Sequence, residues 1–434
     1  MTVEPEQTQT DEHTMLNETP GERRFAWAGF LLAFLWVTYS LNGFRSPTTP
    51  IVLSDLDAGS LLRQVVFGGS AMVSIILLIG TGQLWTVLKR DIYWWIFGLL
   101  LICSSLYSDS PSLTIKRSVL YICGLLTAGL IVSALGSSIQ HVIVLIGTLC
   151  SIVAAVSLVW WGILPAEITT NPGRGGLAGI SNHPNTLAPA MTIGVIVLST
   201  LLTETRRGMI ARLIGLSLCL TALILTWSIT SYIMCFVGVG AAMLTLWGGY
   251  LRGLIAVVLA AAGGALMIMG KARVSDDLFA AFNRDSTMSG RDVLWEIVLE
   301  QIRQFPIFGH GWGAFWYEGR GRDLVGTWNP RQSHNAYFDV MLDVGIVGLT
   351  LFALALAVSL AGVFRCLHAY KNQGARRAAA GSLGVGIGLL SVYGLQQSFF
   401  GKPDSFAFAA LLWICLSVHA QGKRCISVSG STEV

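Results

Sequence analysis

The chain has 434 residues, of which 53% are hydrophobic and only 12% are charged. A soluble domain carries about 25% charged residues, so this composition excludes an ordinary soluble protein and predicts one embedded in membrane lipid. The formal net charge of +4 is too small to indicate a nucleic-acid partner. The eight cysteines form no C-x-x-C pair, and we interpret them as small buried hydrophobes rather than metal ligands or disulfides.

Twelve apolar runs, most of them close to the length of about 20 residues that crosses a bilayer, predict an all-α, polytopic membrane protein. The expected helices are 25–41, 64–80, 92–107, 118–135, 141–163, 186–202, 211–228, 231–248, 253–270, 337–364, 381–398 and 405–420. The predicted divisions are a polar tail at 1–24, helices one to nine at 25–270, a large loop at 271–336, helices ten to twelve at 337–420 and a second tail at 421–434.

The distribution of Lys and Arg predicts the orientation of these helices. An even number of spans returns both termini to one side, and with that side cytoplasmic the inner segments hold fourteen Lys and Arg residues. The short outer segments hold six, namely Arg45, Arg63, Lys116, Arg117, Arg174 and Lys402. Basic residues accumulate on the cytoplasmic side of membrane proteins. We therefore expect both termini in the cytoplasm and the loop at 271–336 outside.

Two of the short outer loops combine turn-forming residues with basic side chains. Residues 171–185 contain Arg174 and end at Asn185, and another loop begins at Pro111 and carries Arg117 before the fourth helix. Outer basic residues run against the topological bias, and binding an anionic lipid-linked substrate is one interpretation of them. Plain contact with lipid headgroups is the other.

The loop at 271–336 contains sixteen charged residues and several aromatic ones, including Trp295. A loop of this length without a function of its own is uncommon. Charges set between aromatic rings suit a glycan, because rings cover the apolar face of a sugar and polar groups meet its hydroxyls. The alternative is that the aromatic residues belong to an interfacial belt.

A helix is predicted inside this loop. Ser289 and Asp292 resemble a capping box, and apolar residues recur behind them at helical spacing until Pro306. We therefore expect an amphipathic helix over 291–304, near the membrane surface, with Arg291 in its first turn. Free N–H groups and partial positive charge at a helix N-terminus, together with an arginine, suit a pyrophosphate. The alternative is an arginine paired with a nearby acid.

The end of the loop places ionisable residues at the start of the tenth helix. His334 lies in Ser333-His334-Asn335, and Asp339 and Asp343 follow on one helix face, four residues apart. Carboxylates in a spanning segment are costly and usually functional, and a histidine can act as a base near neutral pH. The alternative is a surface histidine beside a helix-capping residue.

Several motifs around the long loop stand in a distinctive order. They are Ser289-Gly290-Arg291, Trp295, Pro306, Gly309, Gly311, Ser333-His334-Asn335-Ala336-Tyr337 and Gly345-Ile346-Val347-Gly348, with Gly179-Ile180-Ser181-Asn182-His183-Pro184-Asn185 upstream. Together with twelve helices and a large external loop between the ninth and tenth, they resemble the signature of the O-antigen ligase and polymerase family (Wzy_C). The acid-rich N-terminal tail and the loop are most similar to exopolysaccharide polymerases of rhizobial type.

The resemblance implies glycan transfer at the outer, periplasmic face of the bacterial inner membrane. The donor would be a glycan on undecaprenyl pyrophosphate, the acceptor another glycan, and neither a cofactor nor a metal is implied. By the same resemblance, Arg291 would hold the pyrophosphate and His334 would activate the acceptor hydroxyl. The substrate-binding candidates are Arg174, Arg117, Asn335, Trp295 and Asn185. His310 departs from the pattern, which leads us to expect a less ionisable residue between two glycines.

Three functions remain open at this point. A polymerase would pass the glycan to the next lipid-linked repeat unit, and export and chain-length proteins would be its partners. A ligase would pass it to lipid A core. A transporter or flippase would carry an ionisable or broken-helix site near the bilayer midplane, whereas here the polar residues concentrate outside the spans.

Overall fold

In the described part of the chain, the computed structural model has helices joined by loops and turns, and one isolated bridge between Thr170 and Leu177. The described residues are 20–41, 61–136, 138–171, 175–181, 183–203, 205–248, 255, 291–316, 321, 330–370, 374–395, 397–402 and 404–430. The helices are α2 (Pro20–Ser40), α3 (Leu61–Gly80), α4 (Leu84–Arg90), α5 (Ile92–Cys103), η1 (Ser104–Leu106), α6 (Pro111–Ala134), α7 (Ile139–Ile163), α8 (Ala166–Thr169), α9 (Pro184–Thr200), α10 (Arg206–Leu225), α11 (Ile229–Gly248), α14 (Arg291–Gln304), α15 (Ala336–Ala369), α16 (Gly374–Tyr393) and α17 (Phe406–Gly430).

Each predicted span corresponds to a helix, except 253–270, which lies outside the described residues apart from position 255. The predicted loop at Pro111 is wrong, because α6 begins there. A proline at the first helical position has the required φ and lacks only an N–H that would have no helical partner. The helices also extend into both predicted polar tails, since α2 begins at Pro20 and α17 continues to Gly430.

Five described helices are long and apolar enough to cross a membrane: α3, α6, α7, α10 and α15. Five shorter apolar helices accompany them, at Ile92–Leu106, Pro184–Thr200, Ile229–Leu244, Arg377–Tyr393 and Phe406–Gly422. The chain is therefore helical and apolar in the manner of a multi-pass membrane protein, and the number of twelve spans stays a prediction.

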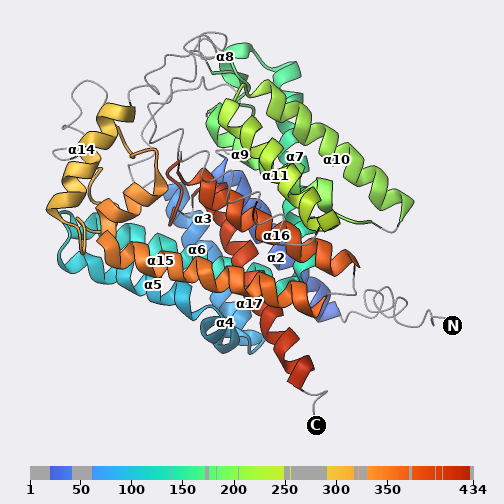
Figure 1. Ribbon diagram of the computed structural model, residues 1–434, viewed down its shortest axis with the longest axis horizontal. Helices are drawn as coiled ribbons and strands as arrows, with labels where there is room; N and C mark the ends of the chain where they lie inside the picture. The colour runs from blue at the N-terminus through green and yellow to red at the C-terminus, as the bar shows by residue number, and fades with distance from the viewer. Residues whose placement is uncertain are drawn as a thin grey trace.

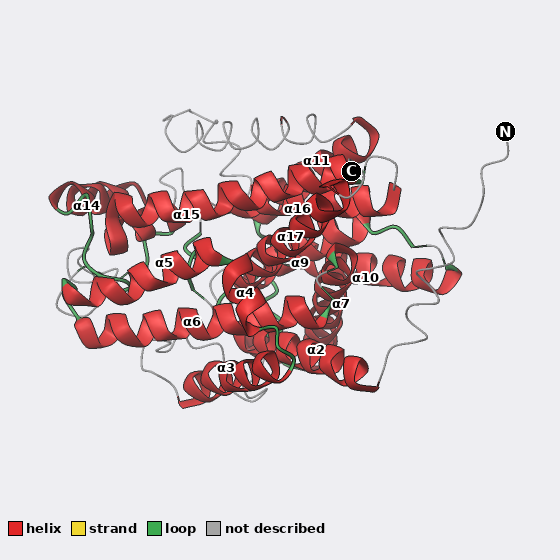
Figure 2. Cartoon of the chain, turned by 90° about the horizontal axis from the view of Figure 1, so that it is seen from below, coloured by secondary structure: helices red, strands yellow, loops and turns green. Residues whose placement is uncertain are grey.

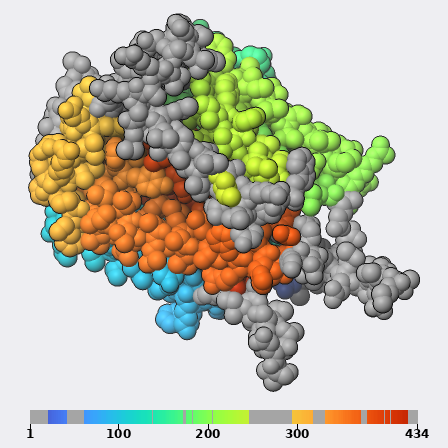
Figure 3. Space-filling model, viewed as in Figure 1, coloured from blue at the N-terminus to red at the C-terminus, as the bar shows by residue number. Residues whose placement is uncertain are grey.

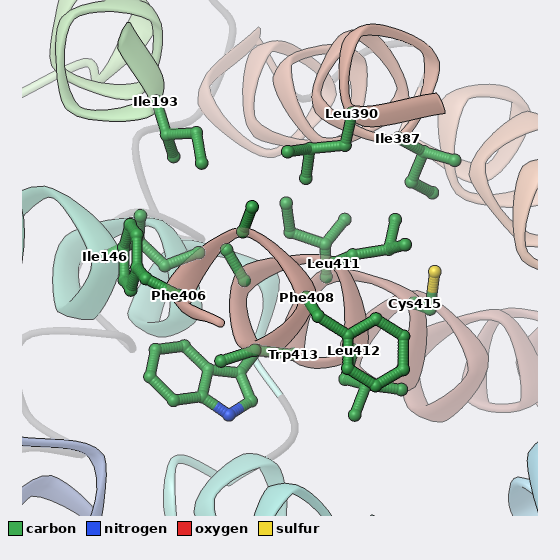
Figure 4. Close-up of a cluster of buried hydrophobic side chains, with 14 of the residues drawn as sticks. Ile146, Ile193, Ile387, Leu390, Phe406, Phe408, Leu411, Leu412, Trp413 and Cys415 are labelled. Atoms are coloured by element: carbon green, nitrogen blue, oxygen red, sulfur yellow. The ribbon is translucent and has the colours of Figure 1, made fainter. Parts of the chain in front are cut away.

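The bundle is organised around α17. Its residues 406–420 are buried throughout, and Leu411 faces Leu390 and Ile387 of α16 (Figure 4). Trp413 meets Trp36 of α2 edge to face at 5.7 Å, a favoured aromatic geometry. Figures 1 and 2 show the other helices arranged about this central one.

A buried polar network joins α17 to the junction of α4 and α5. Asp91 separates those two helices and pairs with Arg90, with 2.7 Å between the guanidinium and the carboxylate. Nδ1 of His419 lies 3.3 Å from the other Asp91 oxygen, and its Nε2 lies 3.1 Å from Ser359 Oγ of α15. Opposite charges are thus paired and buried between the predicted second and third spans.

Replacing Asp91 by Ala is expected to destabilise the protein by about 3–5 kcal/mol, because the buried Arg90 loses its carboxylate. The melting temperature of the detergent-solubilised protein measures the loss. The double variant Arg90→Met with Asp91→Ala is the control and should recover much of the stability, because no unpaired charge remains. A double variant no more stable than Asp91→Ala would contradict this explanation.

Candidate functional site

The helix that carries the predicted histidine is broken. Gly345 has φ 62° and ψ −163° within α15, a conformation that only glycine adopts readily. The 24 residues from Ile346 to Ala369 (369 − 345) rise about 36 Å and are long enough to cross the membrane alone. The break therefore lies near the N-terminal end of α15, the end that follows His334.

A second segment makes the hydrogen bonds that the break leaves open. We call residues 306–316, which follow α14, the glycine segment. The amides of His310 and Gly311 donate to the carbonyls of Leu342 and Asp343, both at 2.8 Å. On the other side of the break, the amide of Ile346 donates to Pro306 at 2.9 Å, and that of Val347 donates to Ile307 at 3.3 Å. An unpaired backbone group in this setting would be costly, so the segment and the break stabilise each other.

The glycines of this segment and of the break allow the two backbones to touch. A Cβ at Gly345 would overlap the carbonyl of Ile307, and a Cβ at Gly309 would overlap that of Leu342. Gly309 also has a positive φ of 68°. The resemblance motifs Gly309 and Gly345 thus have a physical explanation, which is close approach of main chain to main chain.

The glycine segment is anchored on its opposite side to the turn between α5 and α6. His310 Nδ1 lies 2.9 Å from Asp109 Oδ2, and the amide of Trp312 donates to Ser104 Oγ at 3.0 Å. The ionisable His310, a departure from the expected pattern, therefore has a carboxylate partner in Asp109.

Gly313 connects a predicted basic residue to a buried carboxylate. Arg117 of α6 donates to the Gly313 carbonyl, and the Gly313 backbone faces Asp343. Gly313 has φ 68°, and a Cβ there would overlap the Arg117 side chain. Arg117, predicted to contact the substrate, is thus held by a backbone carbonyl. That carbonyl belongs to Gly313, 196 residues later in the sequence.

The His334 segment, residues 330–335, is held from both sides. The Trp295 indole of α14 donates to the Ser333 carbonyl at 2.8 Å, and the Ser333 amide donates to Asp339 Oδ1 at 3.0 Å. Asn335 then caps α15, because its Oδ1 accepts from the amides of Tyr337 and Phe338. His334, between these fixed neighbours, adopts φ 56°, which histidine tolerates better than most residues.

Three cationic side chains come to this part of the fold from separate parts of the chain. Lys402, before α17, lies 3.8 Å from Asp339 Oδ2 and donates to Gln332 Oε1 at 3.3 Å. Arg63 of α3 pairs with Asp404 at 3.3 Å. Arg117 of α6 is close enough to Asp343, Asp404 and Arg63 for their charges to act on its guanidinium group. All three cations belong to the six outer basic residues that the sequence sets against the topological bias.

The two carboxylates of α15 lie beneath these cations. Asp339 and Asp343 are each 7% exposed, and neither Asp339 Oδ2 nor Asp343 Oδ1 has a hydrogen-bond partner. Asp339 Oδ1 accepts from Trp316 Nε1 as well as from Ser333. Among the described residues, no group of three His, Cys, Asp or Glu is arranged to hold a metal ion.

Trp295 and Asn335, both predicted to contact the substrate, are buried and have hydrogen-bond partners within the protein. Trp295 is 9% exposed and packs edge to face on Phe338, so its ring is not open to a sugar and instead holds the His334 segment. Asn335 is 5% exposed, and its side-chain oxygen accepts a hydrogen bond from the Tyr337 amide at the start of α15. Both residues therefore have structural partners within the protein, and their binding of substrate stays a prediction.

The remaining predicted residues lie in different situations. Arg291 is the first residue of α14, as predicted, one turn before Trp295. Arg174 lies outside the described residues. Asn185 lies in the first turn of α9, where its amide donates to His183 Nδ1, and no hydrogen bond within the described chain joins it to the His334 segment.

The arrangement joins α14, the glycine segment and the start of α15 at one end of the bundle. Figures 1 and 2 both show α14 beside that end of α15, next to α5 and α6, and Figure 3 shows α14 and α15 as neighbouring parts of one surface. Sequence reasoning missed Gln332, Arg63 and Lys402 as members of the site. The sequence does mark the two cations, because Arg63 and Lys402 are among the six basic residues in the short outer segments.

Part of the chain is similar to known proteins. The family model described as O-Antigen ligase (Wzy_C) matches residues 191–353, from α9 into α15. The exopolysaccharide production protein ExoQ of Rhizobium meliloti (strain 1021) is 28% identical over 122 residues, which is 26% of this chain and 26% of that protein. The matched region thus spans about a quarter of the relative's length. The family model confirms what the motifs indicated: residues 191–353 carry the O-antigen ligase signature, with His334 and the break at Gly345 inside it.

Proposed function

We propose that the protein is a membrane glycan polymerase that joins repeat units linked to a polyprenyl pyrophosphate into exopolysaccharide at the periplasmic face. The observation that carries the proposal is a group of three cations at this site: Lys402 donates to Gln332 of the His334 segment, Arg63 pairs with Asp404, two residues after Lys402, and Arg117 is close enough to Asp404 and Arg63 for their charges to act on it. Cations gathered near a membrane surface suit an anionic, lipid-linked donor. The similarity to an exopolysaccharide production protein favours a polymer as the product.

The chemistry requires little beyond charge and position. An acceptor hydroxyl attacks the anomeric carbon of the donor sugar while the bond from that carbon to the pyrophosphate oxygen breaks. The pyrophosphate keeps the electron pair, the acceptor proton is released to water, and the anomeric configuration inverts. Cations stabilise the charge that develops on the leaving group, which is the largest single contribution in many enzymes. We place His334 and Arg291 beside these reacting groups.

Ligation to lipid A core is the second candidate, because the matching family model is described as O-antigen ligase. Transport is less well supported. The paired charges of Arg90 and Asp91 satisfy each other, and the break in α15 leaves a full spanning length after it. Neither feature offers the midplane site that a transporter uses.

Glycan analysis of a strain lacking the protein separates these candidates. Accumulated single repeat units on the lipid carrier are the result expected for a polymerase. Full-length polymer left on the carrier, with bare lipid A core, would contradict polymerisation and indicate a ligase. Loss of uptake of a small solute, with normal polysaccharide, would contradict both enzymes.

Replacing Arg291 by Lys is expected to abolish polysaccharide assembly, because lysine lacks the two-pronged donor that fits a phosphate. Polymer yield in the complemented deletion strain is the measurement. Arg303→Lys is the matched control, since Arg303 lies on the same helix, is exposed and pairs with Glu300. Unaltered polymer yield in Arg291→Lys would remove Arg291 from phosphate binding.

A further inference from the structure

The side chains of Lys402, Gln332 and His334 form a chain of contacts whose hydrogen-bond directions can be worked out. Lys402 Nζ lies 3.3 Å from Gln332 Oε1, and Gln332 Nε2 lies 3.4 Å from His334 Nδ1. These residues come from the turn before α17 and from the His334 segment, so the chain exists only in the folded protein. Its first member also lies 3.8 Å from Asp339.

The lysine fixes the orientation of the glutamine. An ammonium group has three donors and no acceptor, so it can face only an acceptor atom. The amide oxygen of Gln332 must therefore point to Lys402, and the amide nitrogen must point to His334. The reverse orientation would bring two donors together. Asp339, with Oδ2 at 3.8 Å from Nζ, helps to hold Lys402 in place.

The glutamine in turn fixes the histidine. An amide nitrogen only donates, so Nδ1 of His334 must accept and must carry a lone pair. In a neutral imidazole one nitrogen carries the proton and the other accepts, which assigns the proton to Nε2. A general base would need the opposite arrangement, with its lone pair on the nitrogen that faces the substrate.

We propose that Lys402 and Gln332 are positioning residues that hold His334 with its proton on Nε2, so that His334 donates a hydrogen bond to the pyrophosphate instead of taking the acceptor proton. This inference rests on the proposed function for its substrate, and on the hydrogen-bond chain for the protonation of the ring. It adds a neutral donor to the three cations. Negative charge develops on the pyrophosphate as it leaves the sugar, and a hydrogen bond from Nε2 of His334 stabilises that charge.

The protonation of the ring can be measured without any assay of activity. The purified full-length protein, labelled with 15N-histidine, contains seven histidines, and a His334→Asn spectrum identifies the signals of His334. At about pH 8, where an ordinary histidine is neutral, we expect a lone-pair signal for Nδ1 and a protonated signal for Nε2. A protonated Nδ1 in the unaltered protein would overturn the proposal, whatever the protein's function.

Gln332→Glu is the decisive variant because a carboxylate accepts from Nδ1. We expect the proton to appear on Nδ1 and polymer yield to fall at least about tenfold, in the range seen when outer partners of a functional group are removed. Equal or higher yield with the proton on Nδ1 would indicate a base and overturn the donor role. Gln301→Glu on α14 makes the same charge change outside the chain of contacts and should leave both readouts unchanged.

Lys402→Met tests the first link. Without the ammonium group, Gln332 can turn either way, so we expect His334 to show both neutral forms and the Gln332→Leu variant to do the same. A single form with Nε2 protonated in Lys402→Met would show that Lys402 does not direct the glutamine. Failure of the proposed function would appear differently, as normal polysaccharide in the deletion strain with the ring protonation as stated.

Discussion

Replacing His334 by Ala is expected to abolish polysaccharide assembly while leaving the protein at its normal level in the membrane. Removing one hydrogen-bond donor from a charge-stabilising site lowers turnover by about 10²–10³-fold, which would bring polymer yield below detection. Polymer yield and chain length in the complemented deletion strain, with immunoblots of the membrane fraction, are the measurements.

Two further variants make this result specific. His334→Asn keeps a residue that tolerates the positive φ of 56° and should also fail, which separates loss of the ring from loss of the backbone conformation. His141→Ala removes an exposed histidine at the start of α7 and should have no effect. Normal polymer length and yield in His334→Ala would remove His334 from the mechanism.

The second large effect is expected for Gly345→Ala. Alanine at φ 62° and ψ −163° is strained by about 1–3 kcal/mol, and its Cβ would overlap the Ile307 carbonyl. The break and the glycine segment then cannot keep their four hydrogen bonds, and the start of α15 moves relative to α14. We expect loss of polymer and a lower melting temperature of the solubilised protein.

Gly240→Ala is the matched control for this variant. Gly240 lies in α11 with a Cβ position that meets nothing within 4 Å, so the same substitution should be tolerated there. Activity and stability of Gly345→Ala equal to those of Gly240→Ala would mean that the break in α15 is unnecessary for the site.

Much of the fold follows from local sequence patterns. The helix over 291–304 has the predicted bounds, because its apolar spacing and Pro306 act within a few turns. The alternative interpretation of His334 as a histidine beside a helix-capping residue agrees with the role of Asn335, because a cap also depends on residues that are close in sequence. Features that depend on neighbouring residues in the chain can be derived from their order alone.

The interior of the site depends on contacts between distant segments, which spacing does not encode. Arg117 meets Gly313 across 196 residues, and Lys402 meets Gln332 across 70. Trp295 illustrates the same limit, because an aromatic residue in a polar loop is equally typical of a sugar platform and of a buried anchor. Only its hydrogen bond to Ser333 and its burial distinguish the two.

The central position of α17 has a consequence for how the molecule is made. A chain emerges from the ribosome N-terminus first, and α17 is the last described helix to emerge. Asp91 is thus synthesised 328 residues before His419, its partner in the folded protein. Helices that insert earlier lack the surface around which they finally pack, so lateral assembly must follow insertion of the last span. A stop codon before Phe406 would therefore cost the protein its centre, although most of the spans had already been inserted.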